Sequence, residues 1–194
     1  ASLTEWFERF DIMAWWNRRL EELSKGMQQK VQFIITVVHR PALLIFDEPF
    51  SGFDPVNAEQ LKHEMLRLKA EGRTLIFSTH NMSSVEEVCD EIALIDHSRV
   101  VLSGNVHEVR ERYKEHLFEV EYVGAIALQP DPTRYTLISA TPSGSGTALR
   151  LRKSPDISNS DLLSSLATQG EVRAFREVLP SMNEIFIKTV EGRG

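Results

Sequence analysis

Two short apolar runs, each followed at once by polar residues, constrain the fold of this 194-residue chain more than any other feature. The first run spans residues 43–46 and is followed by Asp47 and Glu48. The second lies within residues 74–78 and is followed closely by His80. Wholly apolar runs of this length predict strands that are buried on both faces, as in parallel sheets. A helical pattern separates the two runs, so the sequence predicts a βαβ unit.

Periodicity, capping residues and turn residues predict elements along the remainder of the chain. Helices are expected at residues 3–10, 27–39, 55–70, 83–89, 105–115, 158–168 and 180–189. Further strands are expected at residues 92–96, 100–103, 118–123, 134–139, 147–152 and 172–178. We expect an α/β domain with a mainly parallel sheet over residues 1–116 and a small α+β domain over residues 117–194.

Composition and charge exclude several classes of protein. Lys plus Arg number 22 and Asp plus Glu number 28, and the net charge of −6 argues against a basic nucleic-acid-binding surface over the whole chain. No apolar run reaches the roughly 18 residues needed to span a bilayer. Cys89 is the single cysteine, which excludes an intramolecular disulfide and a cysteine-based zinc site. We therefore expect a soluble intracellular protein.

The adjacent carboxylates Asp47 and Glu48 follow a predicted buried strand directly. Ligands of open α/β sheets bind at this carboxyl end of the strands. One carboxylate in such a place can hold a magnesium ion through water, and the other can orient or deprotonate an attacking water. The alternative interpretation is that Asp-Glu-Pro is only a turn that ends the strand.

Two further segments add polar groups that suit a phosphate ligand. Ser24 and Gly26 precede an apolar helix, whose N-terminus would present free backbone N–H groups to an anion. Ser24 is equally well explained as an ordinary N-cap residue. His80 follows the second predicted strand, so it can meet Asp47 and Glu48 at one edge of the sheet, although a lone histidine is more often a surface residue.

Together and in this order, the segments resemble the nucleotide-binding subunit of ATP-binding cassette (ABC) transporters. Leu-Ser-Lys-Gly-Met at residues 23–27 is similar to the signature motif, and residues 43–48 resemble Walker B with its catalytic glutamate. Ser-Gly-Phe-Asp at residues 51–54 resembles the D-loop, and His80 resembles the switch histidine. The match runs from about residue 3 to residue 113. It implies a P-loop NTPase fold of the ABC type, represented here by part of a cassette.

The resemblance implies a role for each matching residue in an ATPase. Asp47 would support Mg²⁺ through water, Glu48 would polarise the attacking water, and His80 would contact the γ-phosphate of ATP. The implied nucleotide-binding residues of the signature are Ser24, Lys25, Gly26 and Met27. The implied dimer-interface residues of the D-loop are Ser51, Gly52 and Asp54.

The resemblance also implies partners and a location. Two ATPase subunits, identical or different, would dimerise head to tail around two ATP molecules and couple hydrolysis to transport through a membrane permease. The protein would lie in the cytoplasm, peripheral on the inner face of the cell membrane. No direct binding of nucleic acid is expected.

The chain departs from the family pattern in one large respect. A Walker A loop needs Gly-x-x-x-x-Gly-Lys-Ser/Thr, and no Gly-Lys pair occurs in the sequence. The Q-loop is also absent before the signature. We therefore expect the C-terminal portion of a longer ATPase subunit, inactive in ATP hydrolysis by itself. A smaller departure is that Lys25 and Met27 replace the common Gly and Gln, and Met27 cannot donate the hydrogen bond of a glutamine.

Two other functions stay open from the sequence. The missing Walker A loop also fits a non-catalytic interaction module that lends its signature helix to a complete partner. Soluble cassette proteins that act on ribosomes or DNA share the signature and Walker B motifs as well. Neither a heptad array nor a basic tail supports that second alternative.

Overall fold

The computed structural model describes residues 2–126 and 128–192. Two compact units make up the chain, Ala1–Cys89 and Asp90–Gly194, and each is described by itself. The sequence predicts a domain boundary between residues 116 and 117, from the extent of the motifs, and this boundary stays a prediction. The outer ends of the expected domains, residues 1 and 194, lie outside the described residues.

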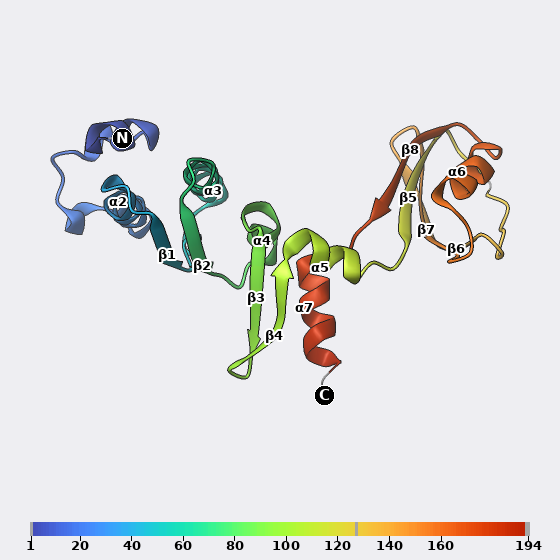
Figure 1. Cartoon of the computed structure of the whole chain (residues 1–194). Coiled ribbons are helices and arrows are strands. Elements are labelled where there is room, and N and C mark those ends of the chain that lie inside the picture. The colour runs from blue at the N-terminus through green and yellow to red at the C-terminus, as the bar shows by residue number, and fades with distance from the viewer. Residues whose placement is uncertain (1, 127, 193–194) are drawn as a thin grey trace. The chain divides into compact units, whose positions relative to one another are not determined.

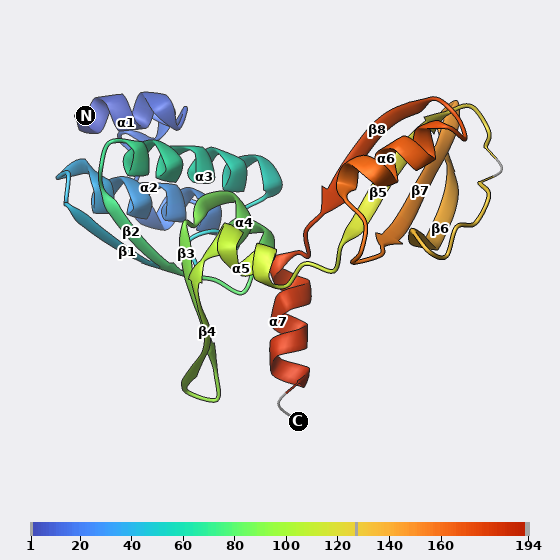
Figure 2. The same ribbon diagram turned by 45° about the vertical axis from the view of Figure 1, so that its right-hand side comes forward.

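The first unit alternates helices with two strands. Its elements are α1 (Leu3–Arg9), the short 3₁₀ helices η1 (Met13–Trp15) and η2 (Leu20–Glu22), α2 (Lys25–Val38), β1 (Leu43–Asp47), α3 (Pro55–Ala70), β2 (Thr74–Ser78) and α4 (Met82–Val88). β1 and β2 pair in parallel, with a register that runs from Leu43 opposite Thr74 to Asp47 opposite Ser78. The long helices α2 and α3 lie on the same side of this strand pair (Figures 1 and 2).

Local sequence explains where these helices begin. The Ser24 hydroxyl accepts a hydrogen bond from the N–H of Met27 and caps α2. The Asp54 carboxylate accepts the N–H groups of two residues in the first turn of α3, which Pro55 opens with a suitable φ. The Asn81 side chain caps α4 in the same way. Each cap satisfies N–H groups that the helix itself leaves without acceptors.

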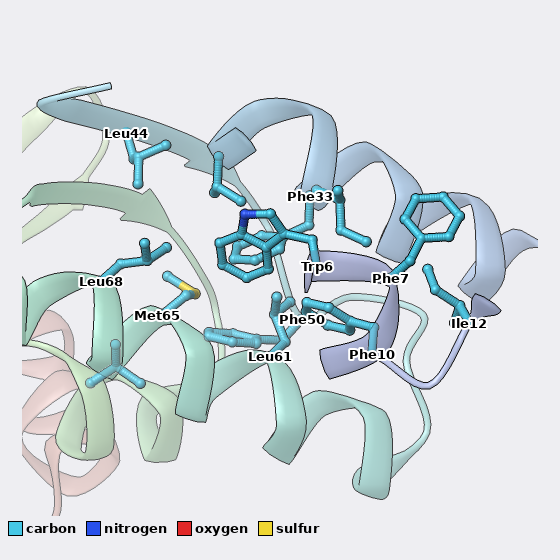
Figure 3. Packing of buried hydrophobic residues seen from close by; sticks show 13 residues of the cluster. Trp6, Phe7, Phe10, Ile12, Phe33, Leu44, Phe50, Leu61, Met65 and Leu68 are labelled. Atoms are coloured by element: carbon cyan, nitrogen blue, oxygen red, sulfur yellow. The ribbon is translucent and has the colours of Figure 1, made fainter. Parts of the chain in front are cut away.

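A cluster of buried aromatic and aliphatic side chains holds the helices of this unit to one face of the strands. Trp6 of α1 lies in the middle of the cluster, between residues of α2 and α3 (Figure 3). Its indole ring meets Phe33 edge to face at 6.0 Å between ring centroids. Ile34 and Met65, which come from α2 and α3, are completely buried. Burial of each large apolar side chain contributes about 1.5–3 kcal/mol, so this cluster fixes the strand ends relative to α2 and α3.

The prediction that both strands are buried on both faces is wrong for one face. Leu43, Ile45 and Ile76 are 48%, 67% and 54% exposed, whereas Leu44 is 1% exposed. The parallel register places Ile45 beside Ile76, so these side chains share one surface. The reason is that α2 and α3 pack on the face of Leu44, and no described element of this unit covers the other face.

The described residues of the second unit form a hairpin, a four-stranded sheet and three helices. Its elements are β3 (Glu91–Asp96), β4 (Arg99–Asn105), α5 (Val106–Arg112), β5 (Leu117–Val123), β6 (Tyr135–Ser143), β7 (Gly146–Lys153), α6 (Asn159–Ala167), β8 (Val172–Val178) and α7 (Met182–Glu191). β3 and β4 form an antiparallel pair, and the sheet has the antiparallel order β6-β7-β5-β8. Among the described strands, β1 and β2 form the parallel pair that the sequence predicts.

The core of the second unit lies between the four-stranded sheet and α6. Phe118, Val120 and Tyr122 alternate along β5 and point to one face, where they meet Leu162 and Leu166 of α6. The Tyr122 hydroxyl donates a hydrogen bond to the carbonyl of Leu166, and burial raises the pKa of this phenol to about 12. Within the described residues, no helix is long and apolar enough to cross a membrane.

Candidate functional site

The carboxyl ends of β1 and β2 bring two predicted site residues together. The register places Asp47 opposite Ser78, and the Ser78 hydroxyl donates a hydrogen bond to the Asp47 carboxylate. The same hydroxyl oxygen accepts the N–H of Glu48 at 3.1 Å. The Glu48 N–H also lies 3.2 Å from the carbonyl oxygen of Ser78. One serine therefore fixes the carboxylate of Asp47 and the backbone of Glu48.

Glu48 has a left-handed backbone conformation and faces His80. Its φ is +46°, which costs about 1–2 kcal/mol for a residue with a side chain. The two hydrogen bonds from its N–H offset part of this cost. Its carboxylate accepts the N–H of His80 at 3.0 Å and lies 2.7 Å from His80 Nδ1. The side chains of Glu48 and His80 are 36% and 84% exposed, so a ligand from solvent can reach both.

The start of α2 forms a second cluster of predicted site residues. The Ser24 hydroxyl accepts the N–H of Met27 at 3.4 Å, as expected of an N-cap residue. Ser24 and Lys25 are exposed, and Gly26 and Met27 are half-buried. Within the described part of the chain, no hydrogen bond or ion pair joins these residues to the carboxylates at the strand ends.

The segment that follows β1 leads to α3 and is held by a residue of α2. Gln29 Nε2 donates a hydrogen bond to the carbonyl of Ser51 at 2.6 Å. Gly52 has a φ of +82°, and a Cβ at this position would lie 3.4 Å from Gln29 Oε1. Gln29 therefore packs against the backbone of the segment as well as bonding to it. Gln29 Oε1 is buried and accepts no hydrogen bond in the described structure.

Asp54 ends this segment as the N-cap of α3. Hydrogen bonds to its carboxylate from the backbone and side chain of Asn57 lower the pKa of Asp54 below its ordinary value of 3.8. Ser51, Gly52 and Asp54 are all exposed, as residues of a dimer interface must be in a single chain. The role of these three residues at an interface between two ATPase subunits stays a prediction.

Sequence reasoning missed three residues that shape the site. Ser78 bridges Asp47 and Glu48, and the parallel register of the predicted strands would have found it. Gln29 joins α2 to the segment after β1, and the only sequence signal is a polar residue one turn after the cap of an apolar helix. The Gln28 side chain donates to the carbonyls of Leu20 and Leu23 and so fixes the chain that enters α2.

The donor atoms at the strand ends suit a hard cation. Asp47 and Ser78 offer carboxylate and hydroxyl oxygens, which are ligands that Mg²⁺ prefers. The residues that the structure describes contain no group of three or more His, Cys, Asp and Glu side chains that could hold a metal ion. A magnesium ion here would therefore rely on water and on a bound phosphate for most of its ligands, which is its usual mode of binding.

Comparisons with known proteins give the class of the fold. The first unit's parallel strands, with acidic and histidine residues at their carboxyl ends, are those of an ABC-type P-loop NTPase cassette. A solved structure of an ATP-binding subunit of an ABC transporter is similar to this chain, with a TM-score of 0.53 and 31% sequence identity. The match covers 57% of this chain and 46% of the chain of that structure. A profile of AAA domains matches residues 17–86, and the profile "ATP-binding protein DrrA1-3-like, C-terminal domain" matches residues 104–190.

Curated relatives then give the family. An ABC transporter ATP-binding protein of Alkalihalophilus pseudofirmus is 37% identical over 185 residues, which are 95% of this chain and 68% of that protein. The ABC transporter ATP-binding protein YhaQ of Bacillus subtilis is 36% identical over 193 residues, 97% of this chain and 62% of YhaQ. The chain thus spans about two thirds of the length of these two relatives. It belongs to the family of ABC transporter ATP-binding proteins and represents the C-terminal portion of such a subunit.

Proposed function

We propose that this chain supplies the hydrolytic residues of an ABC transporter ATPase. The observation that carries the proposal is the contact between Glu48 and His80 beside Asp47, at the carboxyl ends of two parallel strands. Phosphoryl transfer needs positioned groups and charge neutralisation more than covalent chemistry, and this cluster offers both. The family shown by the relatives supports the same reaction.

Glu48 is the proposed residue that activates water. Its carboxylate is held by the N–H of His80, and its backbone is held by Ser78, so its position is fixed before a substrate binds. A carboxylate fixed in this way can accept a hydrogen bond from a water and orient it for attack on a phosphorus atom. Its partial exposure leaves room for that water.

His80 is the proposed contact to the γ-phosphate. Its Nδ1 lies against Glu48, which leaves Nε2 free for a ligand oxygen. In the imidazolium form both ring nitrogens donate, so one ring can bridge Glu48 and a phosphate. The direct bond between Glu48 and His80 also means that movement of either side chain alters the other.

Asp47 is the proposed support for magnesium. Magnesium, when bound together with a nucleotide, neutralises charge on the phosphate oxygens. Asp47 would hold it through water, and the hydrogen bond from the Ser78 hydroxyl orients the Asp47 carboxylate for this task. Ser78 thus acts on the reaction by positioning Asp47 and Glu48.

The residues at the start of α2 are proposed to bind a nucleotide held by a second subunit. Exposed Ser24 and Lys25, with the free N–H groups of the first turn of α2, suit a phosphate. Ser51, Gly52 and Asp54 would then meet the second subunit, and a membrane permease would be the further partner at the inner face of the membrane.

Binding of MgATP tests this proposal most simply. The chain alone lacks a Walker A loop, so we expect it to bind MgATP weakly and to hydrolyse none in calorimetric and steady-state assays. The same chain joined to a Walker A half from a member of the family should bind MgATP. Failure of the joined protein to bind would contradict the proposal and favour a non-catalytic interaction module.

A further inference from the structure

A cavity in the first unit lies away from the strand-end cluster. It has a volume of about 330 Å³ and is lined by residues of α1, by the ends of α2 and α3, and by Arg73 just before β2. This volume is at the lower end of the range for small-molecule sites, about 300–1,000 Å³. None of the residues at the carboxyl ends of β1 and β2 lines it.

Arginine side chains dominate the lining of this cavity. Four of its nine lining residues are arginines, namely Arg9, Arg40, Arg67 and Arg73. Such a convergence of like charges from separate elements is unfavourable unless anions compensate for it. The guanidinium fork is the side chain best matched to phosphate and carboxylate oxygens.

Carboxylates of the protein compensate for part of this charge, and two of them, Glu5 and Glu71, line the cavity themselves. Arg67 Nε donates to buried Glu64 at 2.8 Å, and Arg67 Nη1 pairs with Glu71. Arg9 lies 3.6 Å from the same Glu64 carboxylate, so it shares that partner with Arg67. Arg40 is exposed and forms no ion pair with another described residue. Glu64 and Glu71 thus serve three arginines between them, because Arg73 also pairs with Glu71 at 3.6 Å.

One buried donor in this group has no acceptor, and a second has only a long contact. Arg67 Nη2 is buried and forms no hydrogen bond in the described structure, whereas Arg73 Nε is buried and lies 3.6 Å from Glu71 Oε2, beyond hydrogen-bond distance. A buried donor without an acceptor costs about 1–3 kcal/mol, and more when it is charged. The Arg73 side chain is not free to turn toward solvent, because its Nη1 donates to the carbonyl of Pro41 at 2.7 Å. An acceptor brought by a ligand would remove this cost.

Trp6 keeps two of the arginines in place. The Arg67 and Arg9 guanidinium carbons lie 5.1 Å and 5.7 Å from the centroid of the Trp6 ring, within the range of cation–π attraction. Trp6 is itself 2% exposed and fixed by the core (Figure 3). The donors are therefore preorganised on a rigid surface, which lowers the entropic cost of binding a ligand.

We propose that this cavity binds a phosphate-bearing anion through Arg40, Arg67 and Arg73. A phosphate group offers more acceptor oxygens than a carboxylate, and it can serve Arg67 Nη2, Arg73 Nε and the unpaired Arg40 at once. The cavity lies at the C-terminal end of α2, whereas Ser24 caps its N-terminal end. The site is thus distinct from the nucleotide contacts proposed above and does not depend on them.

Titration of the described chain with inorganic pyrophosphate, followed by calorimetry, tests the proposal. We expect the wild type to bind and the Arg40→Gln variant to bind about tenfold more weakly, since one charged hydrogen bond is lost. Arg40 has no ion pair to lose, so this variant should fold normally. Arg73→Gln should weaken binding as well, with thermal unfolding as the check on its fold. Arg99→Gln, an exposed arginine of β4, is the matched control and should leave the affinity unchanged.

Vesicles distinguish a lipid headgroup from a soluble phosphate as the source. The protein is sedimented with phosphatidylglycerol vesicles and, for comparison, with phosphatidylcholine vesicles. Sedimentation with phosphatidylglycerol alone would identify a lipid headgroup, provided that Arg40→Gln abolishes this binding and Arg99→Gln does not. Binding of pyrophosphate alone, with the same dependence on Arg40, would identify a soluble phosphate compound. The proposal is overturned if the wild type binds neither probe, or if Arg40→Gln and Arg99→Gln weaken binding equally.

Discussion

At the scale of single residues, the site depends on side chains that hold the backbone rather than on the acidic residues alone. Ser78 holds Asp47 and Glu48, and Gln29 holds the segment that contains Ser51. The sequence shows Asp47, Glu48 and His80 because acidic and histidine residues after apolar strands are conspicuous. It does not show Ser78 or Gln29, because their role depends on strand register and on the contact between α2 and the segment after β1.

The hydrogen bond of Gln29 should control the mobility of the segment after β1. We expect Gln29→Ala to lower the free energy of unfolding by about 1 kcal/mol, the typical contribution of one hydrogen bond, and to speed amide exchange at Ser51 and Gly52. Hydrogen-exchange mass spectrometry of the two proteins measures this. Gln32→Ala, an exposed glutamine of the same helix, is the control and should change neither quantity. Equal exchange in all three proteins would show that Gln29 does not restrain the segment.

The cap of α3 should depend on pH in a predictable direction. Hydrogen bonds from Asn57 lower the pKa of Asp54 in the folded state below 3.8. The ionised carboxylate therefore stabilises the fold fully above the unfolded value, and this contribution is lost as the pH falls through the folded value. In Asp54→Asn the cap is neutral, so its stability relative to the wild type should improve below about pH 4. Urea denaturation at a series of pH values tests this, and a difference that stays constant down to pH 3 would contradict it.

At the scale of elements, the sequence predicts helices and strands well where hydrophobic period and capping residues agree. Pro55–Ala70 and Thr74–Ser78 have the predicted bounds, because Asp54, Pro55 and Gly72 mark the ends of α3. The burial of the strands could not be predicted in the same way. An apolar run shows that both faces of a strand are hydrophobic, but not which of them another element covers, and the face of Ile45 is open here.

The apolar face of α2 should account for much of the stability of the first unit. Ile34 is completely buried, whereas its neighbour Ile35 is 57% exposed. We expect Ile34→Ala to lower the free energy of unfolding by about 2–5 kcal/mol, because it leaves a cavity in a packed core. Ile35→Ala should change it by less than about 0.5 kcal/mol. Denaturant unfolding of both variants checks this, and similar losses for the two would mean that α2 presents another face to the core.

At the scale of the whole molecule, the chain joins part of an ABC cassette to a C-terminal region that matches its own family profile. Sequence motifs predict the cassette because its signature, Walker B, D-loop and histidine occur in order. They do not indicate the role of the antiparallel sheet β6-β7-β5-β8, which carries none of these motifs. The structure divides the chain at Cys89, ahead of the hairpin β3–β4, whereas the motifs continue to about residue 113. Packing and sequence motifs therefore mark different boundaries.

ATP hydrolysis by this chain joined to a Walker A half, with and without Glu48→Gln, tests the central claim most directly. Removal of a positioned base typically costs about 100-fold or more in rate, so we expect Glu48→Gln to bind MgATP but to lose hydrolysis by that factor. Glu59→Gln, an exposed glutamate of α3, is the matched control and should hydrolyse ATP as the wild type does. Equal hydrolysis by Glu48→Gln and Glu59→Gln would contradict the assignment of the strand ends as the hydrolytic site.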